Sequence, residues 1–538
     1  MKKSVLTLIA LTFLYSGAFA QDHELEKTYD LNGLADIGDI ANFQYDVATN
    51  TFEITYILLQ SPGKVRVEQY TFDKDYNFLK EKKEDLDADA ASQEYPWWNY
   101  RGEKYQDGMI SVDEKDRLVV RNQVMTYTYN WKKMVYTYKP VAKEYSYITA
   151  DNGEYYFHYR NWWTAEDLNS IYVLCAQISK EDDLNQCKNF HFIKMSKSKE
   201  ILKDTEIRFD YPQEVVFPRF VDDKSDSRFV DKSMEDGIFC LFAPKNMGKK
   251  VSDPQPANYT YIRLDKDLNL VDRIAFVSPA NFWSVDDYID DENSGCTYFL
   301  GASYLSAGKY FDDLTNTKVF SSFQVMKISS HKVDYVTNTG LGEFTAKKIL
   351  PPSEKKGDSY DGKKVFISNY TVTPEGILMV AGQSYSSYRN AQTLEKIVTY
   401  GDCFAFAVDP TGSLLSQYIF NWRGYGSNLP AFQELFAGNN PSNIYWLIMV
   451  PIYTKIEIWG GFGPSWVDIC ASEICKIDLK ANAMTNFYNH QVDKEAHKFY
   501  YLSSTMPYFI TEDHKLLLFG SQSMSSGKRL WFARIALD

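Results

Sequence analysis

The sequence lacks long apolar runs and almost lacks the periodicity of helices. After residues 1–20, no apolar stretch approaches the length that is needed to cross a bilayer. We therefore expect no direct membrane insertion. Apolar residues alternate with polar ones in short runs instead, and these runs are separated by Asp, Asn, Gly and Pro. This period of two is typical of strands, so the sequence predicts an all-β fold.

The motifs of common enzyme and metal sites are also missing. No Cys-x-x-Cys pair and no Gly-x-Ser-x-Gly elbow occurs, which removes the usual support for a zinc site and for a serine nucleophile. Of the seven His, only His490 and His497 are near each other, and their spacing fits no helical metal pair. The sequence favours a protein with no catalytic residue and no metal. A pair of carboxylates brought together only by the fold, as in a glycosidase, stays open.

Positive charge is scarce. The chain has 58 Lys and Arg against 71 Asp and Glu, a formal charge of -13. A general nucleic-acid binder needs a basic footprint, so the composition argues against nucleic acid as a partner.

Cysteine is present in an odd number. Among the seven, Cys175 and Cys187 lie on runs that could be neighbouring strands, and Cys470 and Cys475 are close enough to bridge a turn. Disulfides are permitted in an exported protein. The alternative is that these residues are small buried apolar side chains.

The N-terminus has the three parts of a secretory signal. Lys2 and Lys3 give the positive start, residues 5–15 form a short apolar run, and Ala18-Phe19-Ala20 supplies small residues for cleavage. We expect residues 1–20 to be removed and residues 21–538 to form one domain in the periplasm or outside the cell. No Cys follows the cleavage point, so nothing indicates a lipid anchor.

A short sequence motif that occurs at two distant places in the chain gives the best indication of architecture. Residues 261–276 contain Asp-Lys-Asp-Leu-Asn at 265–269 between two apolar alternations, and residues 70–79 contain Asp-Lys-Asp-Tyr-Asn at 73–77. The pattern recurs at 408–415 and 477–484, and looser versions occur at 195–202 and 328–336. Such residues between alternating runs predict tight turns that join antiparallel strands.

Hairpins of this kind recur along nearly all of the mature chain. Paired in order, they give units that begin near residues 47, 112, 148, 233, 290, 372, 438 and 510. Repeated four-stranded units with little helix resemble β-propeller repeat proteins of the exported bacterial type. The resemblance implies seven or eight four-stranded blades, and the number stays open between these two.

The two ends of the chain suggest how such a ring is closed. The last unit ends with residues 516–520 and 530–536, and its outer strand is missing. Residues 25–31 could supply that strand, which would remove an exposed sheet edge.

The repeated Asp residues allow two interpretations. Asp73-x-Asp75-x-Asn77 and Asp265-x-Asp267-x-Asn269 resemble the start of a calcium loop, in which oxygen ligands occupy alternate positions. The sixth position should be Gly but is Phe78 or Leu270, and the twelfth is Glu84 in one loop and Phe276 in the other. The alternative is that the acids cap hairpin turns by side-chain hydrogen bonds. Calcium therefore remains the one cofactor that the sequence leaves open.

Large aromatic residues gather beside Asn, Arg and Gly in the connections between strands. Such residues dominate contacts with protein partners, could stack on sugars, or could pack between blades. A Gly- and Trp-rich insertion at residues 456–466 is a further candidate for a partner-binding loop. The predicted partner-binding residues are Trp97, Trp98, Trp162, Trp163, Trp283, Trp422, Trp459, Phe462 and Trp466.

These observations predict an exported, non-catalytic propeller that binds protein partners in the bacterial cell envelope. A narrower hypothesis is an accessory periplasmic subunit of an outer-membrane protein secretion assembly. The alternative is a propeller that binds or cleaves glycans, in which the Trp residues would line one pocket.

Overall fold

We analysed a computed structural model of the chain. It describes residues 24–30, 39–46, 48–61, 64–87, 90, 105–112, 117–130, 135–149, 156–157, 163–166, 170–177, 187–196, 200–220, 238–244, 259–280, 282–291, 294–304, 319–389, 396–422, 430–457, 465–490, 492–493, 498–499, 502–503, 508–511, 514–521 and 529–537, and for some strands the backbone alone.

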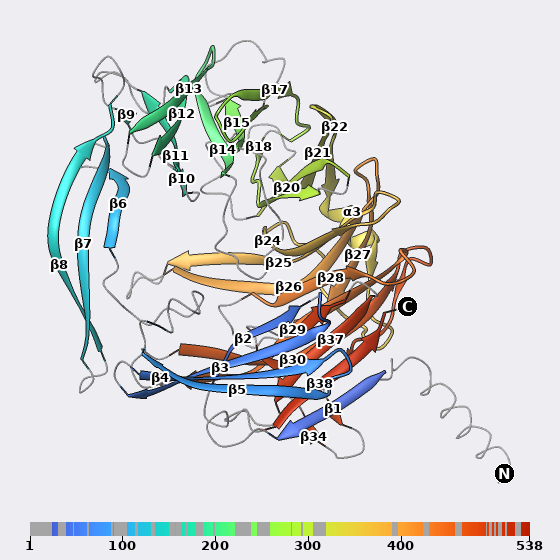
Figure 1. Cartoon of the computed structure of the whole chain (residues 1–538). Helices are drawn as coiled ribbons and strands as arrows, with labels where there is room; N and C mark the ends of the chain where they lie inside the picture. Colours follow the sequence, from blue (N-terminus) through green and yellow to red (C-terminus); the bar gives the residue numbers. More distant parts are fainter. Residues whose placement is uncertain are drawn as a thin grey trace, which may run out of the picture.

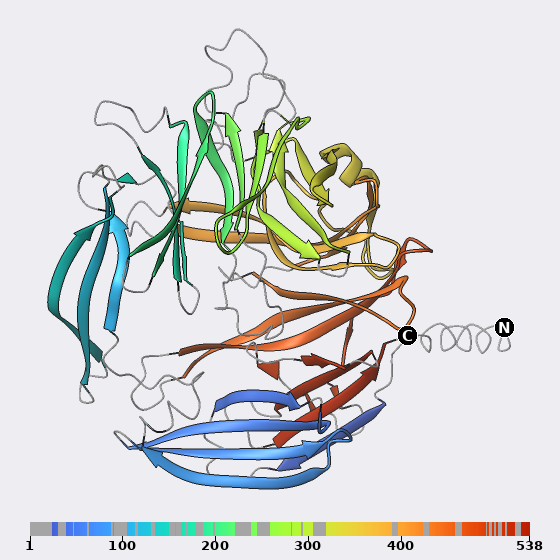
Figure 2. The ribbon, with the colours of Figure 1, turned by 45° about the horizontal axis from the view of Figure 1, so that its top comes forward.

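The described residues form an all-β structure. Eight sheets contain three strands or more, and a ninth has two. In Figures 1 and 2 the sheets follow one another in chain order around a circuit, and the blue first sheet lies beside the red last sheet. This confirms the predicted all-β class and its antiparallel sheets. No helix within these ranges combines the length and the apolar character that a membrane crossing requires.

The first four sheets come from the first half of the chain. Their strands, in the order in which they lie side by side, are β2 (Asp39–Asp46), β3 (Thr51–Ser61), β4 (Lys64–Asp73) and β5 (Phe78–Asp87); β6 (Tyr105–Val112), β7 (Leu118–Asn130) and β8 (Val135–Tyr147); β10 (Trp163–Glu166), β11 (Ser170–Gln177), β12 (Asn189–Ser196) and β13 (Ile201–Arg208), with β9 (Tyr156–Phe157) also on β11; and β14 (Gln213–Phe220), β15 (Ile238–Pro244), β16 (Tyr259–Leu264) and β17 (Leu270–Phe276).

The next two sheets contain five strands each. One comprises β18 (Phe282–Trp283), β20 (Cys296–Tyr304), β21 (Ser322–Ser329) and β22 (Lys332–Gly340), with β19 (Asp287–Asp291) also on β20. The other has the order β23 (Lys348–Ile349), β27 (Leu414–Phe420), β26 (Lys396–Val408), β25 (Leu378–Arg389) and β24 (Lys364–Val372), and the helix α3 (Leu341–Ala346) precedes β23.

The last sheets come from the C-terminal part of the chain. They contain β28 (Phe432–Ala437), β29 (Asn443–Glu457), β30 (Ser465–Asp478) and β31 (Ala483–Met484), with β32 (Tyr488–Asn489) and β35 (Leu502–Ser503) also on β30; the pair β33 (Val492–Asp493) and β34 (Lys498–Phe499); and β36 (Tyr508–Ile510), β37 (Lys515–Ser521), β38 (Arg529–Ala536) and β1 (Leu25–Asp30).

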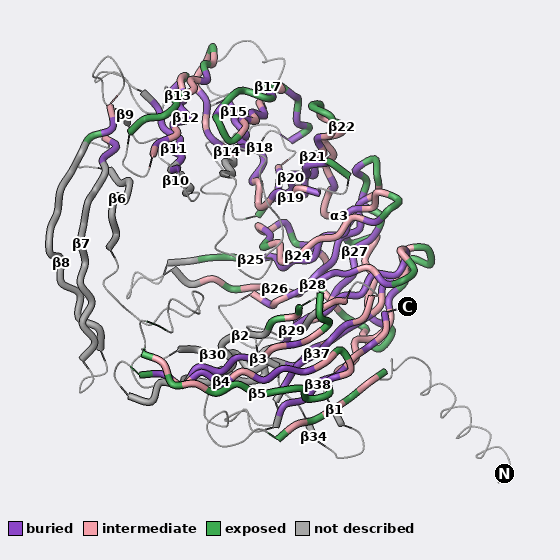
Figure 3. Tube along the Cα trace, viewed as in Figure 1, coloured by how far each residue is buried: buried purple, intermediate pink, exposed green. Residues whose placement is uncertain are grey.

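The core is a series of interfaces between consecutive sheets. In β37, Leu516 and Leu518 pack on the sheet that contains β29, whereas Leu517 and Phe519 pack on the sheet that contains β3. Side chains alternate between the two faces of a strand, so a strand buried on both faces must be apolar throughout. This explains the continuous run Leu516-Leu517-Leu518-Phe519. Figure 3 shows the purple buried residues concentrated in the inner strands of the sheets.

The predicted closing strand is confirmed. β1 pairs antiparallel with β38, from Leu25 opposite Arg534 to Asp30 opposite Arg529. The strand from the start of the chain thus becomes the outer strand of the last sheet, beside β38 and β37. Residue 31, the end of the predicted segment, lies outside the described residues.

One of the two alternatives for the cysteines, a disulfide between Cys175 and Cys187, is wrong. Cys175 and Cys187 form no disulfide, and both are buried. Cys470 and Cys475 share strand β30 and so do not face each other across a turn. The apolar alternative therefore describes Cys175, Cys187 and Cys475, which are buried and in no disulfide.

A half-buried carboxylate joins two neighbouring sheets. Asp286 Oδ2 accepts hydrogen bonds from the N–H of Val365 on β24 (3.0 Å) and of Ala302 on β20 (3.1 Å), and the Ser284 hydroxyl donates to Oδ1 (3.1 Å). Burial raises the pKa of this carboxyl to about 7, against the lowering effect of its hydrogen bonds. Gly301 is required beside it, since a Cβ there would lie 1.9 Å from the Ser284 carbonyl oxygen.

The Asp286 pKa predicts a pH dependence of stability. The folded-state pKa lies above the ordinary value of 3.8, so the folded chain binds more protons between about pH 4 and 7. The free energy of unfolding should fall as pH rises through this window. The ratio of folded to unfolded chain should decrease by on the order of tenfold or more. Asp286→Asn keeps an acceptor for both N–H groups and should flatten the profile, as urea titrations across this range would show. An Asn variant with the same slope as the wild type would assign the slope to other groups.

Candidate functional site: the turn clasps and the outer rim

The repeated Asp residues organise their own turns. Asp73 Oδ1 accepts hydrogen bonds from the N–H groups of Asp75 (2.9 Å) and Asn77 (2.8 Å), and the Asn77 amide donates to Oδ2 (2.8 Å). Asp265 makes the same three bonds, at 2.9, 2.8 and 2.9 Å. Burial raises the pKa of the Asp73 carboxyl, but the hydrogen bonds from Asn77 and Asp75 outweigh it and lower that pKa.

The turn interpretation of the repeat therefore holds for these two sites. The carboxylate oxygens point at N–H donors of their own turn, which is how Asp stabilises a tight bend. Across the described ranges, no three His, Cys, Asp or Glu side chains come together in a group that could hold a metal ion.

The fourth residue of each turn has a left-handed backbone. The φ angle is 58° at Tyr76 and 59° at Leu268, and the same place in the turn at Asp409 is occupied by Gly412, with a φ of 90°. Each turn is closed by two backbone hydrogen bonds and is followed by a register shift. This is a three-residue hairpin loop with a bulge, which needs one left-handed residue. The geometry turns the fourth side chain toward the preceding sheet.

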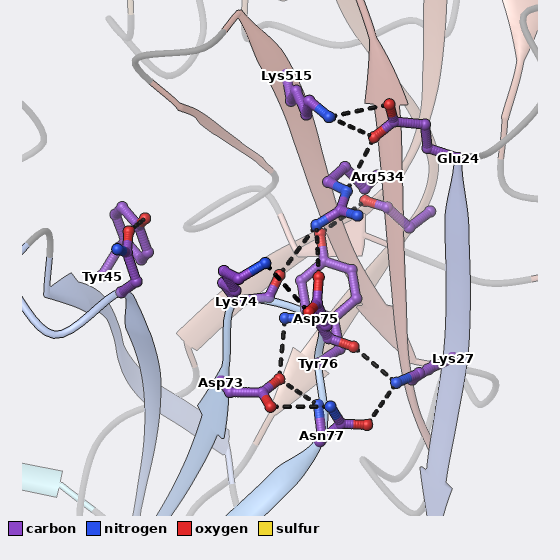
Figure 4. Close-up of polar contacts among 12 residues, drawn as sticks. Glu24, Lys27, Tyr45, Asp73, Lys74, Asp75, Tyr76, Asn77, Lys515 and Arg534 are labelled. Atoms are coloured by element: carbon purple, nitrogen blue, oxygen red, sulfur yellow. Dashed lines mark hydrogen bonds and ion pairs between the residues drawn. The ribbon is translucent and has the colours of Figure 1, made fainter.

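At the ring closure, this turn is held by the last sheet. Figure 4 shows Arg534 and Lys27 reaching the turn from β38 and β1. Arg534 donates to the Lys74 carbonyl (3.1 Å) and to Asp75 Oδ1 (3.2 Å), while Lys27 donates to the Asp75 carbonyl (2.7 Å). Tyr29 donates its hydroxyl proton to the carbonyl of the fourth residue of the turn (2.6 Å). We call this set of contacts the closing seam.

Glu24 anchors the start of β1 to the last sheet. Its carboxylate accepts hydrogen bonds from Lys515 Nζ at 2.8 and 2.9 Å and from Arg534 Nε at 3.0 Å. The hydrogen bond from Lys515 is the main cause that lowers the Glu24 pKa. Since Glu24 is more than a third exposed, its pairs contribute little energy alone, and they chiefly fix the register of β1.

The turn at Asp265 is held in the same way, so the closing seam is one case of a repeated contact. Lys194 on β12 donates to the Lys266 carbonyl (3.0 Å) and to Asp267 Oδ1 (2.7 Å), and Thr205 on β13 donates to the Leu268 carbonyl (2.6 Å). In both cases a basic residue of the third strand and a hydroxyl of the outer strand bind the turn of the next sheet. We call these contacts turn clasps. β1 supplies the outer strand that the clasp at Tyr76 requires.

A third turn is held by its carbonyl alone. The Thr337 hydroxyl on β22 donates to the Gly412 carbonyl at 2.6 Å. A Cβ at Gly412 would lie 2.6 Å from the ring of Tyr335 and 2.7 Å from the Thr337 side chain. The backbone therefore approaches the preceding sheet too closely for a side chain, and Gly replaces the buried Tyr or Leu of the other clasps.

Two of the predicted partner-binding aromatic residues belong to the core. Trp283 on β18 is fully buried, and Trp422, just after β27, is 7% exposed. Both rings are enclosed by neighbouring strands, which is the arrangement expected if such residues pack between blades. Trp163 lies on β10 and Trp466 on β30, but their side chains are not described. Outside the described residues altogether are Trp97, Trp98, Trp162, Trp459 and Phe462.

The structure reveals an exposed apolar feature that sequence reasoning missed. Directly after the turn that precedes the outer strand, four sheets carry an apolar residue that is 39 to 56% exposed: Leu79, Leu202, Val271 and Leu415. In three of them the residue before it is also exposed, at 38 to 48%: Phe78, Ile201 and Leu270. We call these residues the outer rim. The available signal was the pair of apolar residues that follows each repeated turn in the sequence.

Comparisons with known proteins define no family. No family model matches the chain, and no curated protein matches it. Among solved structures, a eukaryotic initiation factor is 8% identical with a TM-score of 0.24, covering 96% of this chain and 94% of that one. A member of the DUF4221 family from Bacteroides vulgatus is 10% identical with a TM-score of 0.22, covering 71% and 94%. The apocarotenoid oxygenase of Synechocystis is 9% identical with a TM-score of 0.25, covering 87% and 94%. Likeness at this level carries no argument about fold or function.

Proposed function

We propose that the chain is a non-catalytic, protein-binding propeller of the bacterial cell envelope. The observation that carries the proposal is the outer rim, where exposed apolar side chains recur at one position of the outer strand. Single exposed apolar residues are ordinary, whereas apolar residues that recur at one place in a repeated fold favour a contact surface. Export follows from the N-terminal signal, and the narrower proposal is an accessory periplasmic subunit of an outer-membrane protein secretion assembly.

The ring geometry supports a common binding face. We propose eight blades, one for each sheet of three or more strands. Each rim residue follows the turn between the third and the outer strand, as at Asp73, Asp265 and Asp409. Blades in a ring repeat the same orientation, so these turns lie at the same end of the ring. A partner that lies along this end could contact several rim residues at once.

Charge substitutions on the rim should weaken partner binding. The double variant Leu79→Lys, Leu202→Lys should recover at least about tenfold less partner from a mild-detergent extract of the native envelope, since it places two charges in an apolar contact. Val319→Lys is the matched control, because Val319 is 55% exposed but lies on no outer strand. Quantitative mass spectrometry of the tagged captures gives the measurement. Equal recovery by both variants would overturn the proposed contact surface.

The glycan alternative requires exposed Trp side chains around one pocket. Trp283 and Trp422 are buried, so this alternative depends on the seven other predicted aromatic residues. A glycan array measures it directly. Binding that disappears in Trp459→Ala, Trp466→Ala, with the rim variants unaffected, would support the glycan function instead.

A further inference from the structure

β17 is an outer strand with an unusually apolar edge. It forms the last strand of the sheet β14-β15-β16-β17. Leu270 is 48% exposed and Val271 is 41% exposed, although successive residues of a strand point to opposite faces. Val277, directly after the strand, is 62% exposed. The start of β17 therefore projects beyond its neighbours on both faces, and Figure 3 shows green exposed residues along it.

The two charged side chains of β17 bind to neighbouring segments of the chain. Only Asp272 and Arg273 are charged in its seven residues. Asp272 is buried and contacts His331 Nδ1 at 2.8 Å, and Arg273 donates to the Arg208 carbonyl at 2.6 Å. Charged residues on an outer strand normally prevent the addition of further strands, and here both charged side chains are directed to other contacts.

Four other edges, those of β5, β13, β27 and β38, are protected in ways that β17 is not. Seven of the ten residues in β5 are charged, as are four of the eight in β13. The edge of β27 is covered by β23, which pairs with it in parallel, and the edge of β38 is covered by β1. Addition of a short strand is thus how this chain completes two of its own sheets.

We propose that an extended segment of a protein partner adds to β17 as a fifth strand. Strand addition uses the free backbone groups of an edge for affinity and the side chains along it for specificity. The segment would carry apolar side chains at alternate positions, to cover Leu270, Val271 and Val277. Its flanks would be basic, because the chain has a formal charge of -13. This inference rests on the proposed protein-binding function and identifies the kind of contact that the partner makes.

Amide hydrogen exchange on the complex captured from the envelope extract tests this inference. The amides of β17 that face away from β16 should exchange rapidly in the free chain and at least about tenfold more slowly in the complex, since new backbone hydrogen bonds protect them. Val271→Lys should abolish this protection and reduce capture, whereas Val271→Thr, which keeps the β-branched shape, should retain both. Val319→Lys, which places a charge at an exposed apolar residue that lies on no outer strand, should leave both the protection of β17 and the capture unchanged.

The outcomes separate the two proposals. Capture with protection of β17 that Val271→Lys removes supports strand addition. A captured partner that protects other rim segments but leaves β17 exchange unchanged overturns strand addition and leaves the protein-binding function in place. If no partner is captured under any condition, the protein-binding function itself fails, and strand addition fails with it.

Discussion

A chain that lacks residues 23–31 should unfold at a clearly lower denaturant concentration than the full mature chain. The deletion removes β1, and with it the six paired positions along β38. It exposes the edge beside Leu530 and Phe532, which are almost fully buried. It also leaves the Trp531 indole N–H without its acceptor Glu26, which lies 2.6 Å away. Several hydrogen bonds and an apolar edge together should cost on the order of 5 kcal/mol.

Two controls make the deletion specific. A synthetic peptide of residues 23–31, added in excess, should restore part of the lost stability by occupying the edge of β38, because ligands that bind only the folded state stabilise it. Lys27→Ala removes two partly or fully exposed hydrogen bonds to the turn, to the Asp75 carbonyl and to Asn77 Oδ1, and should cost only about 1 kcal/mol. Urea midpoints of the four samples measure the effect. An unchanged midpoint in the deletion would show that β1 contributes no stability.

Tyr76→Ala should be among the most destabilising single substitutions in the described part of the chain. The Tyr76 ring is 1% exposed and stacks on Phe532 with centroids 5.0 Å apart. Its hydroxyl donates to the Ala533 carbonyl at 3.2 Å. Removing a buried aromatic ring leaves a cavity between the first and the last sheets. Such truncations cost about 3–5 kcal/mol.

Three further variants show whether the ring itself is responsible. Tyr76→Phe keeps the ring and loses one hydrogen bond, so it should cost about 1 kcal/mol. Leu268→Ala makes the equivalent change in the other clasp and should cost about 2–5 kcal/mol. Tyr76→Gly relieves the left-handed backbone and should be no worse than Tyr76→Ala despite its more flexible unfolded chain. Equal midpoints for Tyr76→Ala and the wild type would contradict a structural role for the clasp.

The sequence predicted features that depend on local rules. Asp73 and Asp265 cap their turns, and β1 completes the last sheet. Both could be predicted because turn chemistry and strand alternation depend on residues that are neighbours in the sequence. The use of the turns could not be predicted in this way. Tyr76 and Leu268 occupy the variable fourth position of the repeated motif. They are buried by a neighbouring sheet whose strands lie more than fifty residues away in the sequence.

The candidate site was harder to predict for the same reason. In the sequence, Trp283 and Trp422 lie in segments whose composition is that of a contact loop. Only the packing of adjacent sheets decides whether such a ring faces a partner or the core. The rim residues were visible as apolar pairs, yet in a strand the same pair is buried whenever another strand covers it. Leu414 and Leu415 show this, since the first is 2% exposed and the second 39%.

The closing seam should also affect the order in which the sheets fold and unfold. Its hydrogen bonds join residues up to 460 positions apart in the chain, as between Lys74 and Arg534. Closing so long a loop from an unfolded chain is slow, whereas each intermediate sheet is assembled from hairpins that are close in sequence. We expect the seam to form last during folding and to open first in the native state. Opening there would separate the first sheet from the last sheet while the remaining sheets stay packed, so the ring should fluctuate at this single joint.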